Sequence, residues 1–260
     1  MDYWSKRNIE AQRKFSELNI QQVNEKLVKY FSNAQEKIIG QFEEVYNKVL
    51  SSIEDGRKPT PADLYKLDAY WKGQIQLRDV LIKLGNLEAE LLSESFIAQY
   101  QKIYEDTAVP SAAAFSTIDT DMAAQIIKHV WAADGKSWDQ RIWDNNALLA
   151  QTLEEEMVNA LIANRPSKEL RAILQERFNV SYHRAETLVR TEIAHITTQA
   201  AQDRYIDAGV TEVEVWADKD ERRCEHCGTL HGKRYPVGGK MPIPAHPNCR
   251  CCLLPVVELD

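Results

Sequence analysis

Hydrophobic residues in the first fifty positions recur at helical intervals. Between Trp4 and Leu50 the chain has no proline and a single glycine, and apolar side chains follow one another in steps of three, four and seven at Leu27, Phe31, Ile38, Phe42, Val45 and Val49. This stripe predicts one amphipathic helix, which at about 1.5 Å per residue would run ~70 Å if unbroken. Because that length exceeds what one small core covers, we expect part of the helix to pack on a partner or on later helices.

A break follows, and two further helices are predicted after it. Gly56 can end the first helix, and Thr60 followed by Pro61 has the form of an N-cap with a first-turn proline. The next helix is expected to stop near Gly85-Asn86, and a third to run from about residue 88 to 104. The second helix carries its apolar residues on one side, and these are Leu64, Leu67, Trp71, Ile75, Leu81 and Leu84.

Small residues replace the periodicity between positions 105 and 118, which makes this stretch the best candidate linker. Beyond it, Asp119 or Thr120 is expected to cap a short helix ending near residue 130, and Ser137 a helix ending near 162. Ser167 and Ser181 are each expected to begin a further helix, the last of which ends at Gly209.

Alternating residues after Gly209 indicate a change to β-structure. The segment VTEVEVWAD alternates valines with glutamates, and CCLLPVV is a second short strand candidate. We therefore predict a mainly α fold with a small C-terminal α+β unit that binds zinc. Three regions are expected: residues 1–108 as an N-terminal helical region for docking a partner, 109–208 as a helical bundle, and 209–260 as the zinc unit packed on the helix 181–208.

Composition narrows the class of protein. The chain has 260 residues, 44% hydrophobic and 27% charged, which is typical of a globular protein with a real core. The polar first thirty residues lack the apolar run of a signal peptide, and no segment approaches the roughly 18 apolar residues of a bilayer span. We expect residence in a reducing cytoplasm and no membrane partner. A formal net charge of −7 argues against non-specific coating of nucleic acid.

All five cysteines lie between positions 224 and 252, and their spacing indicates a metal site. Cys224, Cys227, His246 and Cys249 form a Cys-x2-Cys-x18-His-x2-Cys pattern, in which two short turns would face one another across a tetrahedral Zn²⁺. Four protein ligands leave no open position for a substrate, so the predicted zinc is structural.

Two further cysteines leave the ligand set open. Cys251 competes with His246 or Cys249, because alternate residues of an extended strand project to the same face. Cys252 would then point into the apolar side as a small core residue. His226 and His231 are interpreted as surface histidines, and a general base beside a metal is the less favoured alternative.

The same residues carry a resemblance to a known family. RTEIA, the helix ending in DAGV, the strand ending in Trp216, KDERRCEHC, LHGKRYPV and PAHPNCRCCLLPVV resemble the C-terminal signature of the Mu F-like phage head morphogenesis proteins. The opening DYWSKR and its long helix also resemble members of this family. Besides the four zinc ligands and Cys251, the shared positions are Arg190, Thr191, Glu192, Gly209, Trp216, Gly232, Pro247 and Arg250.

The resemblance implies a minor head, or minor capsid, protein of a tailed phage. Such a protein would join the portal protein during assembly in the host cytoplasm and then occupy the capsid interior or portal vertex. Scaffold protein, major capsid protein and packaged DNA are further candidate partners, and no catalytic residue is implied. A metal-dependent nuclease of the HNH kind, with His231, His246 or Asn248 near the metal, and a non-catalytic DNA-binding protein are the alternatives. We also expect Arg250 to pair with Glu192.

Overall fold

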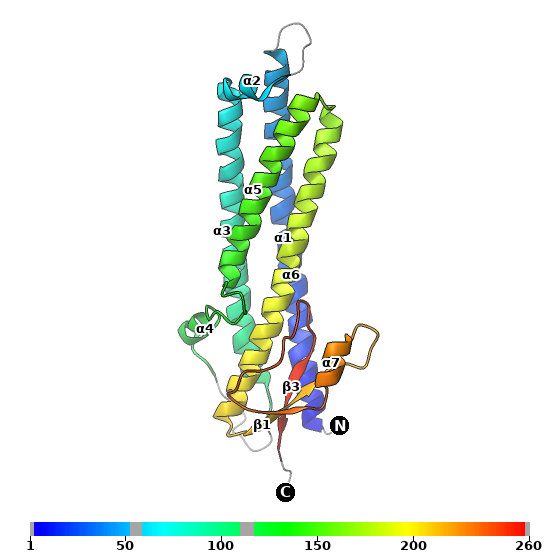
Figure 1. Cartoon of the computed structure of the whole chain (residues 1–260). Helices are drawn as coiled ribbons and strands as arrows, with labels where there is room; N and C mark the ends of the chain where they lie inside the picture. Colours follow the sequence, from blue (N-terminus) through cyan, green and yellow to red (C-terminus); the bar gives the residue numbers. More distant parts are fainter. Residues whose placement is uncertain (1–2, 53–58, 110–116, 258–260) are drawn as a thin grey trace. The chain divides into compact units, whose positions relative to one another are not determined.

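The computed structural model describes residues 3–52, 59–109 and 117–257, and helices account for 71% of these residues. Figure 1 shows the elements and labels all of them except β2. The long helices are α1 (Tyr3–Ser51), α3 (Asp68–Asp106), α5 (Trp138–Ala163) and α6 (Ser167–Asp207), and the short ones are α2 (Pro61–Tyr65), α4 (Thr120–Ile126) and α7 (Glu225–Leu230). Three strands follow α6, namely β1 (Glu212–Trp216), β2 (Arg234–Pro236) and β3 (Cys252–Val256). The predicted fold class is confirmed.

Two compact units make up the chain, and both are assembled from separate stretches of sequence. The first contains Met1–Asn24, Leu91–Trp138 and Thr187–Asp260, and the second contains Glu25–Glu90 and Asp139–Glu186. Each of α1, α3 and α6 therefore contributes residues to both units. The division into regions 1–108, 109–208 and 209–260 stays a prediction. The two compact units have different boundaries.

The second unit has an apolar core built from one stripe of each long helix. Its buried side chains include Leu27, Phe31, Ile38, Phe42, Val49, Leu77, Leu84, Leu153, Met157, Leu161, Leu170, Leu174 and Phe178. The stripe predicted for α1 is thus covered by later helices of the same chain. Removing these side chains from water supplies the main driving force for folding.

Two predicted helix boundaries are wrong. The chain continues as one helix through Gly85-Asn86, and Gly85 serves packing: a Cβ atom there would lie 2.7 Å from the Trp143 ring. Ser181 does not begin a helix either. It is buried inside α6, on the same stripe as Leu174, Phe178 and Ala185. In both cases packing overrides a local signal that is compatible with either outcome.

Other boundaries agree with the prediction. Thr60 and Asp63 form a capping box with Pro61 at the start of α2, and the Asp119 side chain accepts from the Asp121 N–H at the start of α4. Gly209, with a φ of 74°, lies just beyond the end of α6. The predicted break after α1 and the linker at 105–118 fall partly outside the described residues.

The first unit contains the sheet and the cysteines. Its strand order is β2-β1-β3, with β1 antiparallel to both neighbours and Val215 opposite Leu253. Val213, Val215, Leu253 and Leu254 are buried. The strands β1 and β3 were predicted, whereas β2 and α7 were not.

Candidate metal centre

The first pair of cysteines is positioned by α7. Cys224 is the N-cap of this helix, and its Sγ accepts a hydrogen bond from the Cys227 N–H at 3.3 Å. Cys227, one helical turn later, is buried. Because residues three apart lie on the same helix face, both sulfurs point to the same side.

The second pair comes from the turn before β3. The Cys249 N–H donates to the His246 carbonyl oxygen at 3.2 Å, which closes a tight turn around Pro247 and Asn248. Asn248 has a φ of 61°, a left-handed conformation that asparagine tolerates better than most residues. The Asn248 N–H also points to the Thr191 Oγ1 of α6, at 3.4 Å.

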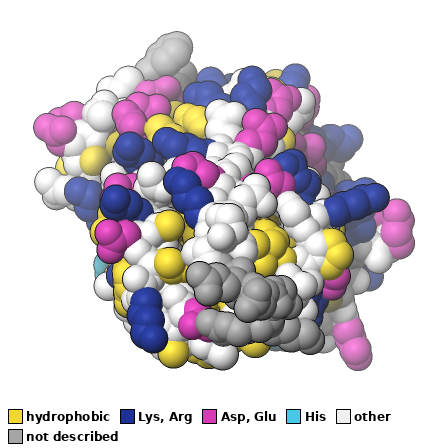
Figure 2. All heavy atoms as spheres, turned by 90° about the horizontal axis from the view of Figure 1, so that it is seen from above, with side chains coloured by type: hydrophobic (Ala, Val, Ile, Leu, Met, Phe, Trp, Pro, Cys, Tyr) yellow, Lys and Arg dark blue, Asp and Glu magenta, His cyan; other side chains and the backbone are white. Residues whose placement is uncertain are grey.

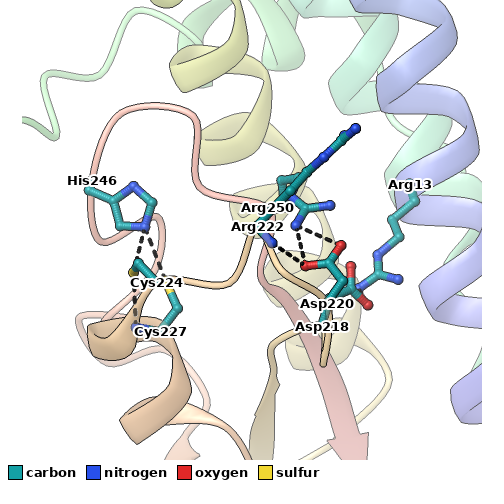
Figure 3. Close-up of polar contacts among 8 residues, drawn as sticks. All are labelled: Arg13, Asp218, Asp220, Arg222, Cys224, Cys227, His246 and Arg250. Carbon is teal, nitrogen blue, oxygen red and sulfur yellow. Dashed lines mark hydrogen bonds and ion pairs between the residues drawn. The ribbon is translucent and has the colours of Figure 1, made fainter.

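The two turns face each other across a small space. Figure 3 shows the His246 ring facing Cys224 and Cys227. Its Nε2 lies 3.3 Å from Cys224 Sγ and 3.1 Å from Cys227 Sγ, and Cys227 Sγ lies 3.9 Å from Cys249 Sγ. In a tetrahedral zinc site with Zn–S bonds of about 2.3 Å, neighbouring sulfurs are about 3.8 Å apart. The Cys227–Cys249 separation matches this value, and the cluster could hold a metal ion. The ligand atoms of Cys224, Cys227 and His246 lie within 4.8 Å of one another, and those of Cys227, Cys249 and Cys251 form a second such group.

The orientation of the His246 ring favours metal binding. Its Nδ1 lies 2.8 Å from the Pro247 carbonyl oxygen, which can only accept a hydrogen bond. This hydrogen bond places a proton on Nδ1 and raises the pKa of His246, and Nε2 is the nitrogen that faces the two sulfurs. Metal-binding histidines are commonly held by a carbonyl group in this way.

Hydrogen bonding and burial divide the thiols into two kinds. A hydrogen bond from the Cys251 thiol lowers the pKa of Cys249 to about 5, and the Cys227 N–H lowers the pKa of Cys224. Burial instead raises the pKa of Cys227 to about 12, and the hydrogen bond to Cys249 raises that of Cys251. The cluster thus stabilises thiolates at two positions, and thiolate is the form that binds metal.

Cys251 remains a competing ligand. Two groups of three residues bring their ligand atoms within 4.8 Å of one another: Cys224 with Cys227 and His246, and Cys227 with Cys249 and Cys251. Cys227 belongs to both, so it is central to either ligand set. Cys252 is buried at the start of β3, as expected for a small core residue.

The predicted pairing of Arg250 with Glu192 is wrong. The Arg250 guanidinium contacts both carboxylate oxygens of Asp220, at 2.7 and 2.9 Å (Figure 3). Glu192 is buried on α6 and accepts a hydrogen bond from the Trp131 indole N–H at 2.9 Å. Arg250 therefore ties the segment before β3 to the loop between β1 and α7, a role that no spacing rule could indicate.

Gly232, Trp216 and Arg190 are signature residues with separate positions in the first unit, and of the three Gly232 lies in a turn. Gly232 has a φ of 77°, and its N–H donates to the Val215 carbonyl oxygen at 2.8 Å. Trp216 packs edge-on against His231, with ring centroids 4.6 Å apart. Arg190 is exposed on α6, next to Thr191.

His231 has a structural contact of its own. Its Nδ1 accepts a hydrogen bond from the Ala217 N–H at 3.2 Å, which joins the end of β1 to the end of α7. His226 is exposed, as expected of a surface histidine. Within the described ranges, neither histidine belongs to a group that could hold a metal.

Comparison with known proteins agrees with the sequence signature. Residues 151–254 match the family described as Phage Mu protein F like protein, which confirms the resemblance over this segment. The match extends from the middle of α5 into β3 and includes His246 and all five cysteines. No curated protein and no solved structure matches the chain.

Proposed function

Because residues 151–254 belong to the Mu F-like family of phage head morphogenesis proteins, we propose that the chain is a minor head protein of a tailed phage. It would join the portal protein during assembly in the host cytoplasm and remain in the virion, in the capsid interior or at the portal vertex. The family match is the single observation that carries this proposal. The cysteine cluster supports a structural function rather than catalysis, because four protein ligands would leave no open position for a substrate.

We infer that the metal is zinc and that Cys224, Cys227, His246 and Cys249 bind it, with Cys251 as the alternative to Cys249. Three sulfurs and one imidazole nitrogen are a ligand set that zinc prefers in structural sites. The metal would join α7 to the turn before β3. Such an ion contributes directly to folding, since the unfolded chain has no comparable site.

Charge and the histidine contacts favour the structural function over the alternatives. In the view of Figure 2, acidic and basic side chains are interspersed, with no large region of one sign on that face. None of the helices in the described ranges combines the length and apolar character of a bilayer span. The hydrogen bond between His231 and Ala217 gives this histidine a role that requires no nuclease activity.

Assembly tests the main proposal. The portal protein of the same phage should co-purify with the full chain, and mass spectrometry should detect the chain in purified heads. Deleting residues 1–50 is unsuitable, because Leu27, Phe31 and Phe42 belong to the core. Heads that assemble normally yet never incorporate the chain would refute the proposal, and so would metal-dependent DNA cleavage lost in His231→Ala.

Metal content tests the zinc assignment independently. We expect one zinc per chain by elemental mass spectrometry, lost in Cys227→Ser and retained in the control Cys252→Ala. Cys249→Ser should release zinc to a chromogenic chelator faster than Cys251→Ser does. The opposite order would assign the fourth position to Cys251.

A further inference from the structure

The first part of α1 turns polar side chains, rather than apolar ones, toward the rest of the first unit. Asn8, Gln12 and Asn19 are the buried side chains between positions 3 and 22, and the first buried apolar residue is Val23. Amide groups and main chain make the contacts. Asn8 both donates to and accepts from the Ala108 backbone, at 2.9 and 2.8 Å, and the Gln12 amide donates to a carbonyl oxygen of β3 at 3.0 Å. Ile9 and Leu18 lie on other faces of this segment.

A shallow groove runs along one of those faces. The α1 residues that line one of its walls recur every three or four positions along the helix. Ile9 and Leu18 are apolar, and most of the others are charged. Trp216 and Asp218 form the opposite wall. Leu18 is 48% exposed, which leaves apolar surface in the groove accessible to another molecule.

Charges along this wall alternate in sign. From the N-terminal end they are Lys6, Glu10, Lys14 and Glu17, all of them exposed. Arg13 also lies on the wall, but it pairs with Asp218 at 2.6 Å (Figure 3), so its charge is neutralised within the chain. The remaining pattern is positive, negative, positive, negative.

A pattern of this kind is complementary to itself in one orientation. When two copies of the helix pair antiparallel, Lys6 of one copy faces Glu17 of the other, and Glu10 faces Lys14. In-register parallel pairing, which is the parallel arrangement with two-fold symmetry, instead places like charges together. The register is also selected, because sliding the helices until Ile9 meets Leu18 would bring Glu10 opposite Glu17. Self-complementary surfaces are what a two-fold dimer requires.

We propose that two copies of this chain associate through an antiparallel contact between their α1 segments, residues 6–21, about a two-fold axis. The four alternating charges fix the direction and register of the contact. Ile9 and Leu18 flank the charged stripe on opposite sides of the helix and do not face one another across the axis. This inference does not depend on the portal, and purified protein is sufficient to test it.

The test uses two charge variants that are each self-repelling and complementary to one another. Glu10→Lys with Glu17→Lys makes the stripe wholly positive, and Lys6→Glu with Lys14→Glu makes it wholly negative. By sedimentation equilibrium, the natural chain should dimerise with rising concentration, and added salt should weaken the dimer. Each double variant should weaken association about tenfold or more, because like charges then face each other. An equimolar mixture of the two variants should dimerise again.

A matched control separates this contact from a general charge effect. Glu36→Lys with Glu90→Lys changes the net charge by the same amount as Glu10→Lys with Glu17→Lys, at exposed positions outside the stripe. This control should leave the dimer intact. Circular dichroism verifies that every variant keeps its helices. The proposal is overturned if the natural chain stays monomeric at all attainable concentrations, or if both double variants dimerise as it does. A monomeric chain whose portal binding is lost in both variants would instead assign the groove to the portal.

Discussion

A buried carboxyl group in the second unit should make the stability of the fold depend on pH. Glu88 is 1% exposed, and its carboxylate accepts a hydrogen bond from the Asn146 amide at 2.9 Å. Burial raises its pKa to about 7 from the ordinary value of 4.5, and the hydrogen bond offsets only part of this shift. The folded chain therefore retains a proton that the unfolded chain has already lost.

The direction of the effect follows from this difference. Below pH 4.5 both states are protonated at Glu88, and the residue carries no penalty. As the pH rises from there toward 7, only the unfolded state gains by ionising, so the free energy of unfolding falls. At about 1.4 kcal/mol per pKa unit, the loss amounts to about 3 kcal/mol by pH 8.

Glu88→Gln removes this penalty and keeps the shape of the side chain. The glutamine oxygen can still accept from Asn146, and its amide can donate to the Asn146 Oδ1, a buried atom without a hydrogen-bond partner in the described part of the chain. We expect the variant to be more stable than the natural chain by about 3 kcal/mol at pH 8 and nearly equal to it at pH 4.5.

Urea denaturation at the two pH values measures the effect. Any titration of the zinc ligands is common to both proteins, so it cancels in the difference between them. The exposed Glu90→Gln is the matched control and should change stability little at either pH. A Glu88→Gln difference that is the same at both pH values would show that Glu88 does not ionise abnormally, and the reasoning would be refuted.

Three further outcomes are expected. Removing zinc with a chelator should expose the backbone amides of β1 and β3 to hydrogen exchange while most of the helical circular dichroism remains, because the metal joins only the segments around the sheet. In urea denaturation, Gly85→Ala should lower the free energy of unfolding by about 1–3 kcal/mol, because the added Cβ would meet the Trp143 ring. Gly40→Ala should raise it by about 0.5–1 kcal/mol, because open space surrounds Gly40 and alanine favours the helix. Arg250→Glu and Asp220→Arg should each speed zinc release, and their combination should restore the natural rate; failure of that rescue would rule out the pairing as a support of the site.

The sequence alone determined those features that depend on neighbours along the chain. Helical periodicity predicted α1, and the Thr60 and Asp119 caps predicted two helix starts. Alternation predicted β1, and the short apolar run CCLLPVV predicted β3. The candidate metal ligands could also be predicted from the sequence, because a Cys-x2-Cys turn is local and the family signature surrounds it.

Tertiary structure decided whatever depends on distant partners. Gly85 and Ser181 carry local signals for helix ends, yet packing against other helices keeps both inside one helix. Arg250 reaches Asp220, thirty positions away, and the polar inner face of α1 is explained by the main chain and the polar side chains that it meets. The ends of a helix and the partner of a charge are settled by which surfaces come together, and spacing along the chain does not contain that information.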